Sequence, residues 1–154
     1  MISGRTLIRY VKDTLMTFAT TEELYSVEDL STYSDLPSVD IELQRAESRI
    51  LRLLNQDWYG NYVRKHAYKQ HGALDTNLLD VDEWRNPVIY YALAYLILPK
   101  LEQTTPIKRK IYTYHLLWEE TYNRLLTFGI TYDADDTLPT TVVAPPGDFL
   151  RLRA

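Results

Sequence analysis

Hydrophobic residues recur at helical spacing in four segments of the chain, and this pattern predicts an all-α fold. The first segment begins after Ser3, a candidate N-cap, and we expect its helix to end near Thr20–Thr21. One face of this helix carries the apolar residues Leu7, Ile8, Val11, Leu15 and Phe18. The acidic stretch Thr21–Pro37, rich in Ser and Thr, predicts a connector with a short helical turn at Glu22–Leu24.

The second helix is expected after Ser38, with Asp40 and Glu42 early in it, where negative charge suits the helix dipole. Its apolar stripe consists of Val39, Leu43, Ala46, Ile50, Leu53 and Leu54. The opposite face carries the arginines Arg45, Arg49 and Arg52. This row favours a solvated surface, and the alternative is a contact with an acidic neighbour or with phosphates.

The third helix should be the centre of the domain. Val88–Leu98 is apolar on every face, and a helix without a polar side is buried all round. Proline favours the first helical position, so we expect the helix to begin around Asn86–Pro87, unless a turn at Asp82–Trp84 extends it. The preceding stretch Asp57–Asp82 has no clear period, although Tyr62–Lys69 favours a helix.

The fourth helix has signals at both ends. Thr105 suits the N-cap, Pro106 the first position and Gly129 the end of the helix. Its predicted core stripe is Ile107, Ile111, Tyr114, Trp118, Tyr122 and Leu125. Tyr112 and Leu116 lie one turn apart on the other side and suggest a second interface, although isolated exposed apolar residues are common.

The segment Ile130–Ala154 has no helical period. Thr140–Ala144 and Phe149–Arg153 have strand character, and a hairpin around the PPGD sequence would join them. An isolated hairpin is barely stable in water, so this arm should either dock on its own bundle or become ordered on another chain. The predicted organisation is a small bundle of about four helices over residues 1–129, in which 1–37 form an N-terminal extension and connector, followed by an extended arm over 130–154.

The composition narrows the classes of function. Without cysteine the chain has no disulfide, thiolate nucleophile or zinc–thiolate site, and a reducing compartment is the default. A net charge of −4 provides no global basic field for nucleic acid. The 13 tyrosines suit either interfaces or the rims of a small core. No signal peptide is expected, and no apolar run is long enough to span a membrane.

Motifs for catalysis or metal binding are missing from the sequence. The glycines are too scattered for a phosphate loop, and there is no HExxH pattern or nucleophile elbow. The acids Asp133, Asp135 and Asp136 lack the glycine and glutamate that complete a calcium loop. His115, at the edge of a core stripe, is expected to be a packed or rim histidine. The sequence therefore predicts no enzyme and no cofactor.

The order of these features resembles the head–tail adaptor, or head-completion connector, proteins of tailed bacteriophages. The resemblance covers roughly Val39 to Arg153. It rests on the segments LQRAESRILRLL (Leu43–Leu54), VIYYALAYLILPKLEQ (Val88–Gln103), KIYTYHLLWEETYNRLL (Lys110–Leu126), GITYDADDT (Gly129–Thr137) and LRLR (Leu150–Arg153). Residues Met1–Pro37 are a longer extension than this family implies.

The resemblance implies a structural protein of the virion neck, made in the host bacterial cytoplasm. Copies would form a ring, by resemblance a dodecamer, beneath the portal protein. The C-terminal arm would become structured only on the portal, and the other side of the ring would receive the next neck protein or the tail. Packaged DNA would pass through the channel without sequence-specific binding, and no membrane is involved.

The candidate sites are accordingly interfaces. The expected portal contacts are Asp133, Asp135, Asp136, Phe149, Leu150, Arg151, Leu152 and Arg153. The expected contacts between subunits are Tyr112, Leu116, Arg45, Arg49 and Arg52. One alternative is a helical nucleic-acid-binding or regulatory module that uses the arginine row with Arg64 and Lys65. Another is an all-α enzyme whose site is assembled from scattered residues.

Overall fold

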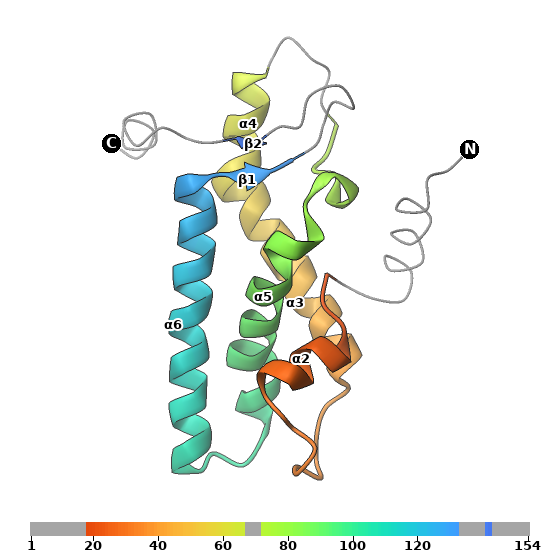
Figure 1. The fold of residues 1–154 in the computed structure, drawn as a ribbon, viewed down its shortest axis with the longest axis vertical. Coiled ribbons are helices and arrows are strands. Elements are labelled where there is room, and N and C mark those ends of the chain that lie inside the picture. The colour runs from red at the N-terminus through yellow and green to blue at the C-terminus, as the bar shows by residue number, and fades with distance from the viewer. Residues whose placement is uncertain (1–17, 67–71, 133–140, 143–154) are drawn as a thin grey trace, which may run out of the picture.

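The computed structural model describes residues 18–66, 72–132 and 141–142, which form a helical bundle (Figure 1). The helices are α2 (Thr21–Val27), α3 (Val39–Leu54), α4 (Gly60–Lys65), α5 (Val81–Tyr91) and α6 (Thr105–Phe128). Shorter helical segments are the π-helical η1 (Asn55–Tyr59) and η3 (Ala92–Ile97) and the 3-10 turns η2 (Thr76–Leu78) and η4 (Leu98–Lys100). Two short strands follow, β1 (Ile130–Thr131) and β2 (Thr141–Val142). The predicted all-α fold class is confirmed.

The segment of α5 and η3 forms the centre of the bundle. The segment formed by α5 and η3 packs against α3 and also against α6, so that it lies between them. Figure 1 shows that α3 and α6 run in the same direction, whereas α5 runs the opposite way. None of the helices among the described residues is long and apolar enough to cross a membrane.

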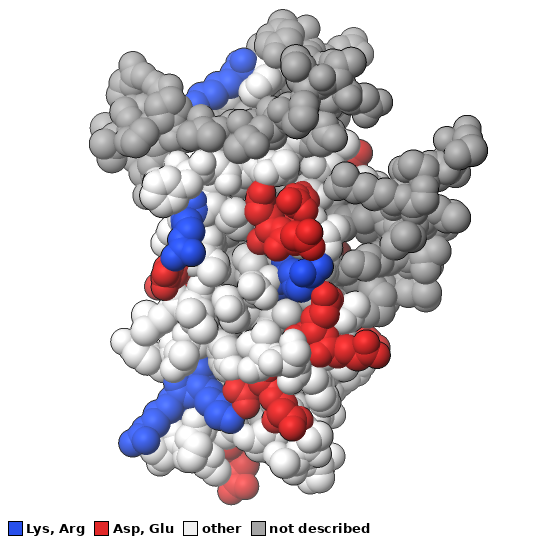
Figure 2. Space-filling view, viewed as in Figure 1, with Lys and Arg blue, Asp and Glu red and all other residues white. Residues whose placement is uncertain are grey.

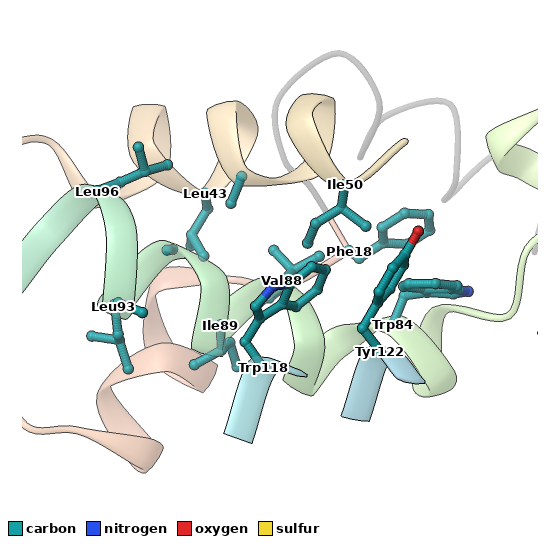
Figure 3. Close-up of a cluster of buried hydrophobic side chains, with 14 of the residues drawn as sticks. Phe18, Leu43, Ile50, Trp84, Val88, Ile89, Leu93, Leu96, Trp118 and Tyr122 are labelled. Carbon is teal, nitrogen blue, oxygen red and sulfur yellow. The ribbon is translucent and has the colours of Figure 1, made fainter. Parts of the chain in front are cut away.

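Side chains from α3, α5, η3 and α6 meet in one core (Figure 3). Along the bundle, Ile50 of α3 lies level with Trp118 and Tyr122 of α6. Val88–Leu98 is buried as predicted over most of its length, except that Tyr95 remains 37% exposed. Burying a large apolar side chain contributes roughly 1.5–3 kcal/mol, so this shared core is the main source of stability.

Two helices begin at other residues than predicted. α5 starts at Val81, so the start near Asn86–Pro87 is wrong and the alternative, a turn at Asp82–Trp84 that extends the helix, is confirmed. The Asp80 side chain accepts a hydrogen bond from the backbone N–H of Asp82 and caps the helix there. Pro87 consequently lies inside α5, where it is buried. α6 is capped by Thr104 rather than by Thr105.

The segment predicted as a connector contributes to the core. Thr20 and Glu23 form a capping box that starts α2, and Leu24 and Leu30 are fully buried. The first predicted helix falls largely outside the described residues. Its expected end near Thr20–Thr21 is wrong, because the two residues before Thr20 are not helical and Thr20 already belongs to the cap of α2.

The chain continues in the core beyond the end of α6. Gly129 adopts φ 129°, a conformation that residues with a side chain rarely adopt, and this turns the chain away from the helix axis. Ile130 and Tyr132 are buried, and β1 pairs with β2 in antiparallel register, Ile130 with Val142 and Thr131 with Thr141. The strand character predicted around Thr140–Ala144 is therefore present at 141–142, but its partner is β1. The PPGD sequence lies outside the described residues.

Candidate subunit interfaces and arm anchor

The outer side of α6 carries an exposed aromatic surface. Tyr112 and Leu116, predicted as an interface pair, are 66% and 48% exposed. The ring of His115 lies 4.2 Å from that of Tyr95, which extends the surface onto η3. Glu119, also exposed, lies one turn beyond. We call this set, Tyr95, Tyr112, His115, Leu116 and Glu119, the tyrosine face.

The outer side of α3 carries the predicted arginine row. Arg45, Arg49 and Arg52 are all exposed, and Ile41, 49% exposed, lies one turn before Arg45. We call these four residues the arginine face. Arg45 is partly neutralised by Glu42, whose Oε1 lies 2.9 Å from its Nη1. Arg49 and Arg52 form no ion pair with any residue that the structure describes.

The two faces point away from each other. Trp118 marks the buried side of α6, and at 3.6 residues per turn Leu116 lies roughly 160° from it around the helix axis. Arg52 has the same relation to the buried Ile50 of α3. Because α5 and η3 lie between α3 and α6, the tyrosine and arginine faces are on opposite sides of the bundle.

Acidic residues on α2 and α5 already have partners within the chain. Figure 2 shows red acidic groups gathered over α2 and the first turn of α5. Arg85 reaches both Glu23, at 2.6 Å, and Asp82, at 2.7 Å. Lys110 lies 2.6 Å from Glu28, and this hydrogen bond raises the pKa of the lysine. Three acids of this surface, Glu23, Glu28 and Asp82, are therefore compensated by the chain's own cations, whereas the exposed Glu22 forms no ion pair with a described residue.

The first residues of the predicted arm are held by a built contact, which we call the arm anchor. Glu83 of α5 accepts two hydrogen bonds from Thr131, at 2.9 Å from the backbone N–H and 2.5 Å from Oγ1. Next to it, Tyr132 is 2% exposed, and its Oη accepts a hydrogen bond of 3.0 Å from the backbone N–H of Asp75. Burial raises the pKa of the Tyr132 phenol well above its usual value.

The ring of Tyr132 completes an aromatic cluster at this end of the bundle. Its edge-to-face partners are Trp58 at 5.4 Å, Tyr59 at 5.8 Å and Tyr62 at 5.0 Å between ring centroids. Tyr59 in turn donates a hydrogen bond of 2.8 Å to the carbonyl of Gly72. Edge-to-face pairs of this kind are each worth about 0.5–1.5 kcal/mol beyond simple burial. The prediction that the whole arm becomes structured only on another polypeptide is thus wrong for its first three residues.

Other sequence-predicted residues fall in two groups. The expected portal contacts Asp133, Asp135, Asp136 and 149–153 lie outside the described residues. Arg64 and Lys65, assigned to the alternative basic surface, are exposed on α4. Sequence reasoning missed Glu83 as an anchor residue, because its partner Thr131 is 48 positions away and no local pattern links them.

Two buried tyrosines of α6 donate hydrogen bonds to carboxylates from other parts of the chain. Tyr122 donates a hydrogen bond of 2.9 Å to Asp57, and Tyr114 donates one of 2.7 Å to Glu28. Burial, followed by these hydrogen bonds to carboxylates, raises the pKa of both phenols, which keeps them protonated. Among the described residues, no group of three His, Asp or Glu side chains could hold a metal ion.

Comparison of the chain with protein-family models, curated proteins and solved structures finds no match.

Proposed function

We propose that the protein is a structural head–tail connector of a tailed bacteriophage, which forms a ring under the portal and extends the DNA channel. One observation carries this proposal: two exposed surfaces of different chemistry lie on opposite sides of one bundle. A ring whose contacts are head-to-tail needs two different lateral surfaces on every subunit. The tyrosine and arginine faces meet that requirement.

The arm anchor supports the proposal on which end of the bundle faces the portal. Thr131 and Tyr132 hold the start of the arm at the end of the bundle where α6 finishes (Figure 1). In the proposal this end faces the portal, and residues beyond Tyr132 make the portal contacts. The opposite end, where α6 begins, faces the next neck or tail protein.

Two truncations test the role of the arm. A chain that stops after Tyr132 retains the anchor and should keep its helix content, yet fail to assemble with the portal protein encoded by the same genome. A chain that stops after Gly129 loses Ile130 and Tyr132 from the core and should also lose stability. Circular dichroism measures the first property, and mass photometry with negative-stain images measures assembly. Full assembly by the chain that stops after Tyr132 would exclude the arm as the portal contact.

Arg49 and Arg52, which form no ion pair within the described part of the chain, favour one alternative, a module that binds nucleic acid through the arginine face. This alternative predicts binding to duplex DNA with a steep dependence on salt, lost in Arg49→Glu/Arg52→Glu. If the protein does not bind DNA in low salt but does form rings on the portal, the nucleic-acid alternative is excluded and the connector function is supported.

A further inference from the structure

We infer that the arginine face of one copy packs directly on the tyrosine face of the next, with Arg49 opposite Glu119. The inference rests on the proposed function, because it takes the ring axis to run along the bundle. It goes further by stating which surface meets which, and in what register.

The charges of the two faces are complementary. Arg49 and Arg52 have no partner among the described residues, and Glu119 likewise forms no ion pair with a described residue. Burial raises the pKa of the Tyr95 phenol, and the nearby groups of Tyr91 and then Glu119 raise it further, so the charge of Glu119 belongs to the tyrosine face. The neighbouring acid Glu120 is paired instead with Arg124, at 2.5 Å.

The rival acidic surface over α2 and α5 is a poorer partner. Its acids Glu23, Glu28 and Asp82 already have a cation within the same chain. A second copy would have to compete with Arg85 and Lys110 for them. An arginine gains most from a carboxylate that has no other partner, which favours Glu119 over Glu23, Glu28 and Asp82.

The register follows from the direction and level of the helices. A closed ring relates neighbours by rotation without translation along its axis, so contacting residues lie at the same height. α3 and α6 run in the same direction, and Ile50 lies level with the stretch from Trp118 to Tyr122 (Figures 1 and 3). Both helices rise equally per residue, which brings Arg49 to the height of Glu119.

The same register brings the apolar members of the faces together. Ile41, two turns before Arg49, comes to the height of Tyr112, two turns before Glu119. Arg45 then falls near His115 and Leu116, where its guanidinium can lie against the aromatic surface. The interface would thus have apolar contacts at the height of Tyr112 and an ion pair two turns further along, at the height of Glu119. A specific interface commonly combines apolar and polar contacts in this way.

Cysteine cross-linking tests the pairing, since the natural chain has no cysteine. Ser48→Cys places a thiol beside Arg49, and Asn123→Cys places one a turn beyond Glu119; both positions are exposed. The two variants, carrying tags of different size, are mixed and treated with a short bismaleimide. We expect the mixed product to exceed either self-product by at least about tenfold, the ratio that a preference of 1.4 kcal/mol produces.

Charge reversal supplies the specificity control. Arg49→Glu/Arg52→Glu in the Ser48→Cys chain should reduce the mixed product about tenfold or more, and Glu119→Arg in the Asn123→Cys chain should restore most of it. Glu22→Cys, on the acidic surface of α2, serves as the position-matched control and should give only background product. Circular dichroism of each variant confirms that it is folded.

The possible outcomes separate the two proposals. Equal self-products and mixed products, cross-linking to the Glu22→Cys chain, or no product at any soluble concentration would overturn the inferred pairing. Rings that still form on the portal in that case would leave the connector function standing. Mixed product that obeys the charge swap, without any portal assembly, would support the pairing and count against the connector function.

Discussion

Replacing Tyr132 by alanine measures how strongly the arm anchor belongs to the core. The side chain is 2% exposed, packs edge-to-face on three aromatic rings and accepts a hydrogen bond from the backbone of Asp75. Truncating a large buried aromatic residue to alanine typically costs about 3–5 kcal/mol. A domain of this size has about 5–15 kcal/mol of stability in total, so Tyr132→Ala should lose a large fraction of it.

Urea unfolding followed by far-ultraviolet circular dichroism measures this loss. Tyr112→Ala is the matched control, because the same substitution at a residue that is 66% exposed should change stability by less than about 0.5 kcal/mol. Tyr132→Phe isolates the hydroxyl group and should cost about 0.5–1.5 kcal/mol, the worth of one hydrogen bond. If Tyr132→Ala and Tyr112→Ala cost the same, the start of the arm is not part of the core and the anchor does not exist.

Three further predictions concern buried polar groups. Glu83→Gln should destabilise the fold by about 1.5–3 kcal/mol and speed amide exchange at Thr131, because both bonds of Thr131 lose their charged acceptor; unchanged exchange measured by NMR would contradict this. Glu42→Gln should cost about 1 kcal/mol in urea titrations, since the buried carboxylate lies 3.1 Å from a Lys100 that is itself half exposed; a gain in stability would refute the ion pair as a stabilising contact. Burial and the hydrogen bond to Asp57 raise the pKa of Tyr122, so as the pH rises the unfolded chain loses this proton before the folded chain does. The contribution of Tyr122 to stability should therefore be complete below about pH 10 and fall above it, and the free energy of unfolding should fall less steeply with pH in Tyr122→Phe.

Elements with strong local signals were predicted well from the sequence. α3 begins after Ser38, where its apolar stripe starts, although the Ser38 side chain makes no capping hydrogen bond. α6 ends before Gly129, where the end of its apolar stripe and the glycine agree. The exposure of Tyr112 and Leu116 also followed from helical spacing alone. These features depend only on residues a few positions apart.

Features that depend on distant residues were not predicted. The pattern left two starts open for α5, and the burial of Trp84 against the rest of the bundle favours the longer helix. The polar composition of Thr21–Pro37 suggested a connector, although Leu24 and Leu30 are buried. Whether a leucine in a polar stretch meets the core is decided by tertiary packing, which no short window of sequence contains.

The proposed portal contacts and the proposed subunit contacts differ in how far the sequence alone could predict them. Helical periodicity placed both lateral faces, since it determines which side of α3 and α6 is turned outward. The arm has no such period, and its anchor depends on a glutamate in α5 and on an aromatic cluster contributed by η1 and α4. The alternation of apolar and basic residues at Leu150–Arg153 therefore remains a prediction.

The two hydrogen bonds between Thr131 and Glu83 determine how a pulling force would be transmitted through the molecule. A force applied to the C-terminal segment passes from Thr131 into α5 and from Tyr132 into the aromatic cluster, rather than peeling the last turn of α6 away. The load enters the bundle at the end where α6 finishes and is shared there between the first turn of α5 and the aromatic cluster. A neck that must withstand strain from a filled capsid would gain mechanical strength from such a path.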